Sequence, residues 1–487
     1  NIPWLIPIID CYTYVFRGVP VLVLLFMVYF GLPGIGFKVP PLMAMALSLG
    51  LVASAYLAEV FRGAFNSVDP AEVVAAYESV KSKIDLGSIE RREAELKHDV
   101  KARIEEFNAL AGHQRNHLGL TSRDVTENIE GWQIKTSLEL TLSSSAQLLE
   151  ELAKKIKSYS DLAIVGRTHN VPAQLTTLGR RFASWGEEFL IALENLETLH
   201  TNYRIKGIKG AIGSGSDLKA LHSENWLEVE RAVADKLGIE TTLIAPSQIY
   251  PRSLDFQVVA SLYQLAAPIA SIAINIRLMA GLGLLSEGKA SGQVGSSAMP
   301  HKNNPRLSER VGGLFVLLKG YLTMVSEISG NQWNEGDVSE SVVRRVALAD
   351  SFYTIDAILR SMKKILSELQ VNESAISREL DRELEYLLSS KVLLKAVEKG
   401  IGRESAHSLI LESATESRSS SSETFFELLA KNKELALSLS ELEALKSNPG
   451  EHLGDASKQA QQVLKLVRTQ ISALKKFGNQ SLDEISN

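Results

Sequence analysis

Residues 292–310 hold side chains that could do acid–base chemistry on carbon. Two serines with a glycine-rich flank are followed by a lysine, an asparagine and a glutamate: Ser296, Ser297, Lys302, Asn304 and Glu309. An ordinary serine hydroxyl is too weak a base for a carbon acid, so a nearby cation or loop amides must activate it inside a closed, dry site. The lysine and the glycine-rich flank offer both. A flexible, glycine-flanked serine with a lysine six residues further on can therefore supply a base and a cationic hydrogen-bond donor.

His169 lies in the stretch Gly-Arg-Thr-His-Asn-Val-Pro-Ala-Gln, residues 166–174, just ahead of a long amphipathic segment. A histidine between Thr168 and Asn170 at the entrance to a helix can be held by its neighbours and can donate a proton to a leaving group. Taken alone, such a histidine is more often structural or simply exposed. A catalytic role for His169 is therefore supported by the whole nine-residue stretch and not by the histidine alone.

Two histidines and two adjacent hydroxyl residues occupy the region from residue 98 to residue 122: His98, His117, Thr121 and Ser122. Adjacent hydroxyls with loop amides are good donors to a carboxylate. The alternative is an ordinary helix cap, which the pattern Thr-Ser-x-Asp by itself does not exclude.

Two later segments carry side chains suited to binding an anion. Gln248 can bind an amide or a carboxylate, and Arg252 can pair with an anion. Ser341 and Arg345 are four residues apart, so they share one helical face and their donors can converge on a phosphate. In isolation, solvated surface roles are equally common for such residues.

The composition of the chain restricts its class. Its 487 residues can form a large core, and a net charge of −5 argues against a nucleic-acid-binding surface while leaving local phosphate pockets open. The single cysteine, Cys11, excludes an intramolecular disulfide and suits a reducing, cytoplasmic compartment. The nine histidines show no metal-ligand spacing, and no dinucleotide motif or P-loop occurs. We expect neither a metal nor an organic cofactor.

The first 66 residues differ from the rest of the chain. Residues 18–37 and 39–58 are uncharged stretches of 20 residues, each long enough to cross a bilayer core of about 30 Å. Residues 14–33 resemble a fragment of a polar amino-acid ABC-transporter permease, although two spans cannot build a transporter. The sequence predicts an N-terminal hydrophobic helical hairpin, which either contacts a membrane or packs as a buried hairpin of a soluble protein.

From about residue 68 onward the pattern is that of long amphipathic helices. In residues 177–200, apolar side chains recur every three or four positions, with charged ones between them. The same pattern covers residues 132–160, 255–287, 307–328, 342–370 and 455–476. Short breaks rich in Gly, Pro and Ser connect these segments, and no run of alternating strands is evident. The sequence therefore predicts an all-α fold with a central bundle of long helices.

We expect four regions along the chain. They are the permease-like segment 1–66, the remainder of an N-terminal helical domain at 67–130, a central bundle with the catalytic loop at 131–370, and a C-terminal helical domain at 371–487.

Residues 292–310 and 166–174 together resemble two motifs of the fumarase/aspartase superfamily, and residues 97–124 are similar to the adenylosuccinate lyase family in particular. The resemblance extends over residues 68–487. It implies the all-α lyase fold of that superfamily, with active sites shared between the subunits of a homotetramer. It also implies β-elimination of fumarate from a purine nucleotide substrate: from adenylosuccinate, giving AMP, and from succinyl-aminoimidazole-carboxamide ribotide in purine biosynthesis.

The resemblance also implies a role for each candidate residue. Ser296 is the general base, with Ser297 as an alternative, and His169 is the general acid, oriented by Glu309. The residues that stabilise the dianionic carboxylate are Lys302 and Asn304. The residues that hold the succinyl group are Thr121, Ser122 and Gln248. The histidines near the base or the phosphate are His98 and His117, and the phosphate contacts are Arg252, Ser341 and Arg345.

The chain departs from this family at its N-terminal end. Members of the family carry an Arg-Tyr pair there that helps to bind the phosphate, whereas no Arg-Tyr dipeptide precedes residue 98 in this sequence. The hydrophobic segment occupies that place. Two alternatives therefore stand beside the adenylosuccinate interpretation: a sister lyase acting on argininosuccinate or a cycloisomerisation substrate, and an inactive, membrane-tethered scaffold.

Overall fold

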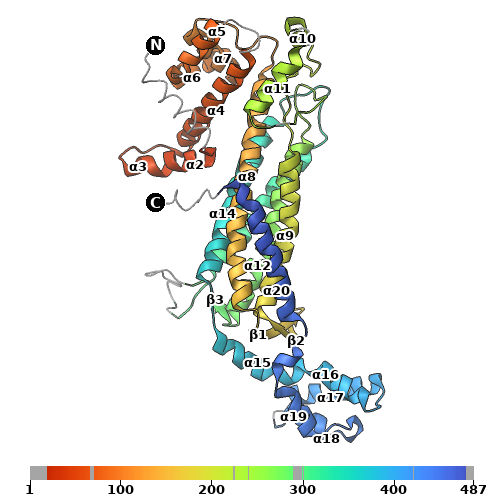
Figure 1. Ribbon diagram of the computed structural model, residues 1–487. Helices are drawn as coiled ribbons and strands as arrows, with labels where there is room; N and C mark the ends of the chain where they lie inside the picture. The colour runs from red at the N-terminus through yellow and green to blue at the C-terminus, as the bar shows by residue number, and fades with distance from the viewer. Residues whose placement is uncertain are drawn as a thin grey trace.

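The long helices pack side by side into a bundle, as the computed structural model shows (Figure 1). The structure describes residues 19–65, 71–222, 225–239, 241–288, 299, 301–419 and 422–478. Six helices make up the bundle: α8 (Ser122–Ser158), α9 (Leu178–Asn202), α12 (Ser253–Gly281), α13 (Arg306–Ile328), α14 (Ser341–Glu368) and α20 (Ala456–Leu474). The predicted all-α class and the central long-helix bundle are therefore confirmed.

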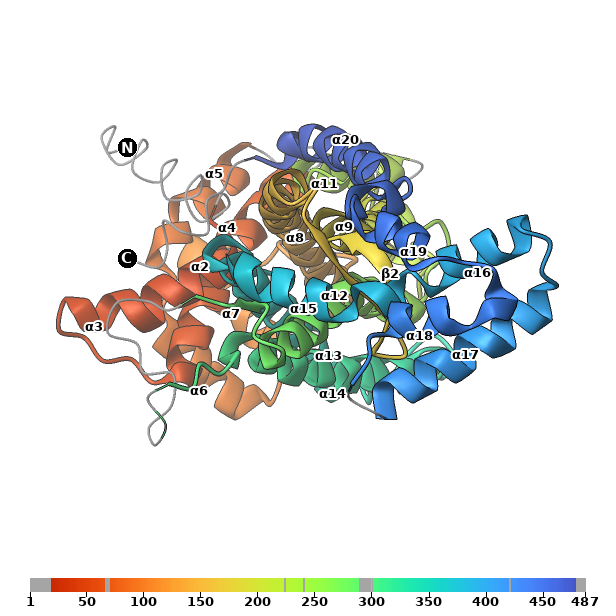
Figure 2. The same ribbon diagram turned by 90° about the horizontal axis from the view of Figure 1, so that it is seen from below.

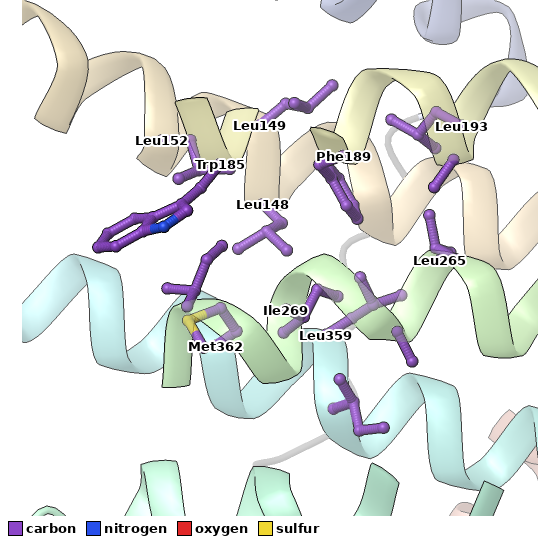
Figure 3. Packing of buried hydrophobic residues seen from close by; sticks show 14 of the residues in the cluster. Leu148, Leu149, Leu152, Trp185, Phe189, Leu193, Leu265, Ile269, Leu359 and Met362 are labelled. Atoms are coloured by element: carbon purple, nitrogen blue, oxygen red, sulfur yellow. The ribbon is translucent and has the colours of Figure 1, made fainter. Parts of the chain in front are cut away.

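The core of the bundle is built from the apolar stripes that the sequence pattern predicts. Leu148 and Leu152 of α8 face Trp185 and Phe189 of α9, and Ile269 of α12 lies between these helices and α14 (Figure 3). Side chains three or four positions apart lie on one side of a helix, so each helix buries a continuous stripe. Burial of these stripes holds the six helices together.

The direction of α8 gives the bundle two distinct ends. The helix has 37 residues and is therefore about 55 Å long at 1.5 Å per residue. Its first turn lies near the N-terminal helices, and its last turn lies near a small β-hairpin at the far end (Figure 1). Residues near these two ends are therefore far apart within one chain.

A β-hairpin precedes α9, and here one sequence prediction is wrong. Strands β1 (Ala163–Thr168) and β2 (Val171–Thr177) pair in antiparallel register, which the sequence pattern did not indicate. His169 lies in the turn of this hairpin with φ of 51° and not at the entrance to the helix, which begins at Leu178 after the cap residue Thr177. Buried and exposed positions do not alternate regularly along either strand, so the sequence gives no period-two signal here. A second two-residue pair joins β3 (Leu285–Ser286) to β4 (Gln370–Val371).

The C-terminal helices project from the end of the bundle that carries β1 and β2 (Figures 1 and 2). They are α15 (Glu373–Leu387), α16 (Ser389–Glu398), α17 (Arg403–Ser419), α18 (Phe425–Lys431) and α19 (Leu439–Lys446). Phe425, Phe426 and Val392 form their core, together with Val165 and Leu175 of the hairpin. The next helix, α20, returns to the bundle and packs against α8 and α9.

The opposite end of the bundle carries smaller helices from two parts of the chain. They are α5 (Ala71–Ser79), α6 (Leu86–Leu96), α7 (Asp99–Ala111), α10 (Ser216–His222) and α11 (Trp226–Lys236). Tyr77 of α5 and Phe107 of α7 pack against Val125 and Ile129 in the first turns of α8. These contacts fix the loop that precedes α8.

The predicted N-terminal helical hairpin is present. It consists of α2 (Val21–Phe26), a π-helical turn at Met27–Gly31, α3 (Leu32–Gly34) and α4 (Pro41–Phe65). Leu24 and Val52 are buried in one cluster with Trp132 of α8 and Leu237, the residue after α11, so the hairpin packs on the body of the protein. Its tip, at α3, projects away from the bundle (Figure 2).

Within the uncharged stretch 18–37 the helical run covers Val21–Gly34 and ends at Pro33-Gly34, so it is shorter than the stretch itself. The apolar helical stretches described in the hairpin, Val21–Gly34 and Pro41–Ala53, have 10–17 residues. The helices long and apolar enough to cross a bilayer are α12 and α13. Both belong to the bundle, where α12 is a core helix, so this property is weak support for a membrane span.

Candidate active site

A cavity of about 870 Å³ lies at the α8 N-terminal end of the bundle. Helices α8 and α14 form its main walls, the α6–α7 junction forms another side, and Pro20, Val21, Leu22 and Leu49 of the hairpin close it. Four of the predicted site residues line this cavity: His98, Ser122, Ser341 and Arg345. Three segments that are far apart in the sequence therefore meet there.

His98 is the N-cap residue of α7. Its Nδ1 accepts a hydrogen bond from the backbone N–H of Lys101 at 3.2 Å. An accepting Nδ1 leaves the ring hydrogen of a neutral imidazole on Nε2. The capping contact thus orients the ring and defines its tautomer, while about half of the side chain, 51%, stays exposed to a ligand.

Thr121 and Ser122 begin α8, where Ser122 lines the cavity. Thr121 and Asp124 form a reciprocal capping box, in which the Thr121 N–H donates to Asp124 Oδ2 at 2.9 Å. The cap that the sequence left as an alternative is therefore real. It does not compete with anion binding, because a helix N-terminus also favours negative charge through its free N–H groups and its dipole.

His117 lies in the loop before α8, outside the cavity lining. Burial lowers the pKa of its imidazole, although nearby Asp124 and a hydrogen bond to the backbone of Thr121 act in the opposite direction. Its Nε2 is buried and has no hydrogen-bond partner within the described part of the chain. The lowered pKa favours a neutral ring at neutral pH.

Ser341 and Arg345 begin α14 and line the cavity from its other wall. The neighbouring Arg344 is buried and differs completely in its contacts. Its guanidinium pairs with Asp255 of α12 at 2.7 Å and with Glu130 of α8 at 2.8 Å. Both arginines line the cavity, but Arg344 is buried and joins three helices, whereas Arg345 is exposed.

Arg252 and Gln248 lie outside the cavity lining. Arg252 is 3% exposed, and its Nη2 donates to Glu127 at 2.6 Å and to Glu340 at 2.9 Å. The Gln248 backbone N–H donates to the carbonyl of Glu335, which ties this turn to the loop before α14. In this conformation Arg252 pairs with two carboxylates, which together compensate its charge.

The polar face of α8 was missed by the sequence reasoning. Residues three or four positions apart line the cavity along this helix: Ser122, Thr126, Glu130, Gln133 and Ser137. This spacing is a detectable signal, because it places a polar stripe opposite the leucine stripe that faces the core. Lys97 and Arg123, each next to a predicted residue, add positive charge to the lining.

The remaining predicted residues lie near the opposite end of the bundle. His169 is exposed in the β1–β2 turn, and Lys302, Asn304 and Glu309 lie immediately before and within the first turn of α13. In the described part of the chain no hydrogen bond joins Glu309 to His169. Ser296 and Ser297 lie outside the described residues. One chain therefore separates the candidate residues into two groups, roughly one helix length apart.

The start of α13 is held by Glu287, a buried carboxylate that the sequence reasoning also missed. Its oxygens accept from the backbone N–H groups of Leu307 and Ser308, at 3.0 and 2.7 Å. A carboxylate at a helix N-terminus satisfies donors that have no partner within the helix. The contact fixes the direction of the first turn of α13, which carries Glu309.

Comparison with known proteins places these features in a family context. Residues 54–316 match the family model described as lyase, and residues 385–463 match the model described as adenylosuccinate lyase C-terminus. The adenylosuccinate lyase of Saccharomyces cerevisiae is 33% identical over 333 residues, covering 67% of this chain and 69% of the yeast protein. That of Archaeoglobus fulgidus is 32% identical over 379 residues, covering 77% of this chain and 84% of the archaeal protein.

Solved structures share the fold at lower identity. The fumarate lyase from Mesorhizobium sp. BNC1 superimposes with a TM-score of 0.73 at 19% identity, covering 85% of this chain and 94% of that one. The 3-carboxy-cis,cis-muconate lactonizing enzyme from Pseudomonas putida gives a TM-score of 0.73 at 21% identity, covering 86% and 94%.

Proposed function

Because the chain belongs to the adenylosuccinate lyase family and is a fumarate-releasing C–N lyase, we propose that it eliminates fumarate from adenylosuccinate, giving AMP. We propose the same reaction on succinyl-aminoimidazole-carboxamide ribotide, the related intermediate of purine biosynthesis. The observation that carries the proposal is one cavity with hydroxyl and cationic donors on two facing helices, Ser122 on α8 and Ser341 with Arg345 on α14. A volume of about 870 Å³ suits a nucleotide-sized ligand.

The proposed reaction breaks one C–H and one C–N bond. Ser296 (or Ser297) removes the Cβ proton, and the electron pair becomes the C=C bond of fumarate as the C–N bond breaks. His169 protonates the departing nitrogen and is oriented by Glu309, and Lys302 and Asn304 stabilise the dianionic carboxylate. Overall, one substrate molecule gives one fumarate and one purine product, and no cofactor is consumed.

In the same proposal the α8 end of the bundle binds the substrate. Thr121, Ser122 and Gln248 hold the succinyl group, Ser341 and Arg345 bind the phosphate, and the histidines at 98 and 117 lie near the base or phosphate. Arg252 was predicted as a third phosphate contact. Its two carboxylate partners mean that this role requires a rearrangement of the Glu127 and Glu340 contacts.

We propose that the active sites form between subunits of a homotetramer. The two groups of candidate residues lie near opposite ends of a helix about 55 Å long, so antiparallel packing of neighbouring chains would bring the groups together. An uncovered apolar surface supports this assembly, because only 22% of the most apolar stretch of α13 is buried. Val316 and Leu317 are among its exposed side chains.

The experiment that tests the function uses the purified full-length chain. Loss of adenylosuccinate and appearance of fumarate are followed by ultraviolet absorbance, with argininosuccinate as the comparison substrate. We expect turnover of adenylosuccinate, and a loss of about 10²-fold or more in kcat for His169→Gln. Turnover of argininosuccinate alone would support the sister-lyase alternative, and activity equal in wild type and the Ser296→Ala/Ser297→Ala variant would contradict the mechanism.

A second proposal concerns the N-terminal hairpin, because its tip exposes large apolar side chains: Met27, Phe30, Ile35, Phe37, Leu42 and Met43. We propose that this tip enters the interfacial region of a membrane on the cytoplasmic side, while the lyase body stays in water. Co-sedimentation with anionic lipid vesicles tests it. The full chain should pellet with the vesicles and the Phe30→Ser/Phe37→Ser variant should not, whereas equal recovery of both in the supernatant would contradict the proposal.

A further inference from the structure

A loop between α9 and α10 is clamped by side chains of two helices. Residues 206–210, Lys-Gly-Ile-Lys-Gly, lie across the start of α8 and against α11. Three buried side chains bind this loop: Asp124 and Asn128 from α8, and Glu230 from α11. We call residues 206–210 together with these three side chains the 206–210 clamp.

Asp124 is the centre of the clamp and is 3% exposed. Its Oδ1 accepts from the ammonium of Lys206, which is fully buried, and from the backbone N–H of Lys209 at 3.0 Å. Its Oδ2 accepts from the N–H of Gly210 at 3.0 Å and from the N–H of Thr121 at 2.9 Å. One carboxylate thus binds the loop and the first residue of the α8 cap at the same time.

The other two side chains of the clamp hold the loop backbone. Asn128 accepts from the N–H of Gly207 at 2.8 Å and donates to its carbonyl at 3.0 Å. Glu230 accepts from the N–H of Ile208 at 2.9 Å and from the ammonium of Lys209 at 2.6 Å. Gly207 has φ of 80°, and a Cβ there would lie 2.4 Å from Glu230 Oε2, so this backbone requires glycine.

We propose that Asp124, together with Lys206, is a positioning residue for the hydroxyl donors at the start of α8, an inference that rests on the proposed function. Asp124 binds the N–H of Thr121, Thr121 precedes the cavity-lining Ser122, and the His117 ring bonds to the backbone of Thr121. The three proposed substrate contacts therefore share one anchor. Hydrogen-bond donors that are displaced by about 1 Å bind a carboxylate much more weakly.

The test must avoid leaving a buried charge unpaired, because removal of one partner alone would destabilise the whole fold. The variant is therefore Asp124→Asn/Lys206→Met, which removes both charges while keeping side chains of similar length. Its matched control is Lys209→Met/Glu230→Gln. This second ion pair lies in the same clamp with both side chains nearly buried, but its side chains bind the loop to α11 and do not touch the α8 cap.

Two readouts are compared in the full-length chain: steady-state kinetics with adenylosuccinate, and amide hydrogen exchange of the segment 117–124. For Asp124→Asn/Lys206→Met we expect KM to rise about tenfold, with kcat within about threefold, and faster exchange in this segment. In the control variant, KM, kcat and the exchange rate of this segment should all stay as in wild type. An unchanged KM, or an equal rise of KM in both variants, would overturn the proposal.

Absence of turnover in the wild-type chain would contradict the proposed function and not the clamp itself. In that case the hydrogen-exchange measurement alone would test whether Asp124 anchors the start of α8. Faster exchange confined to the Asp124→Asn/Lys206→Met variant would support the anchor, and equal exchange in both variants would overturn it.

Discussion

Arg344 and Arg345 are consecutive in the sequence and both line the cavity, yet their environments differ. Arg345 is exposed there, whereas Arg344 is buried and pairs with Asp255 and Glu130. A helix turns by about 100° per residue, so neighbours on a helix point in different directions. Substitution of Arg345 should therefore affect mainly ligand binding, whereas substitution of Arg344 should also lower the stability of the fold.

Replacing Arg345 with Met should weaken substrate binding with little effect on folding. A hydrogen bond to a charged group contributes about 1.5–3 kcal/mol, which corresponds to a rise of about 10- to 100-fold in KM for adenylosuccinate. Steady-state kinetics measure this change. Arg468→Met, an exposed cation on α20 away from the cavity, serves as the control. An unchanged KM in Arg345→Met would argue against a phosphate contact.

Replacing Arg344 with Met should instead lower the free energy of unfolding by about 3–5 kcal/mol, because Asp255 would remain buried without its cation. Urea denaturation followed by circular dichroism measures the loss. A variant as stable as wild type would mean that the three-helix contact of Arg344 contributes little.

His117 should make folding stability depend on pH. Burial lowers the pKa of its imidazole below the ordinary value of 6.5, so the folded state resists protonation while the unfolded state accepts it. The contribution of His117 is therefore fully present above pH 6.5 and declines as pH falls below this value. Thermal unfolding of wild type and His117→Gln at several pH values between about 5 and 8 should show a smaller acid loss in the variant. Parallel curves would contradict this assignment.

At the scale of secondary-structure elements, the N-terminal hairpin combines an anchored base with an exposed tip. Leu24 and Val52 are buried with Trp132, whereas Phe30 is 64% exposed. The hairpin also supplies Leu22 and Leu49 to the cavity wall. Its base therefore packs on the lyase body, while its tip keeps an exposed apolar surface.

Substitution within the hairpin should distinguish its base from its tip. Leu24→Ala should destabilise the folded chain by about 2–5 kcal/mol, the usual range for a buried leucine. Phe30→Ser, at the exposed tip, should leave stability nearly unchanged in the absence of lipid. Chemical denaturation of both variants provides the comparison, and equal stability of the two would show that the hairpin does not fold together with the body.

At the scale of the whole molecule, the two groups of candidate residues lie near opposite ends of the bundle, so the proposed active site would combine residues of more than one chain. His98 lies near one end of α8, and His169 lies in the hairpin beyond its other end. If sites are shared between antiparallel neighbours, a chain defective at one end can supply an intact other end. Shared sites therefore predict that two variants, each inactive alone, regain activity when their subunits are mixed, whereas a site within one chain does not.

Mixing two inactive variants should restore activity. His98→Ala and His169→Ala homo-oligomers are each expected to lose most turnover, whereas subunits exchanged under mild denaturant should form some sites with both histidines intact. Fumarate release from the mixture, compared with that of each variant alone, measures the complementation. A mixture no more active than its parts, with exchange verified by mass spectrometry, would contradict shared sites.

The sequence by itself determined the helical class, the long helices of the bundle and the order of the candidate motifs, because these depend on local spacing along the chain. It also placed Ser341 and Arg345 on one helical face. Only the tertiary structure decided that Arg252 pairs with Glu127 and Glu340, that Asp124 anchors residues 206–210, and that His169 lies in a β-turn. These contacts join residues about 80 or more positions apart, or depend on strands whose buried and exposed positions do not alternate. Periodicity reports which side of a helix is buried, but it carries no information on which distant element covers that side.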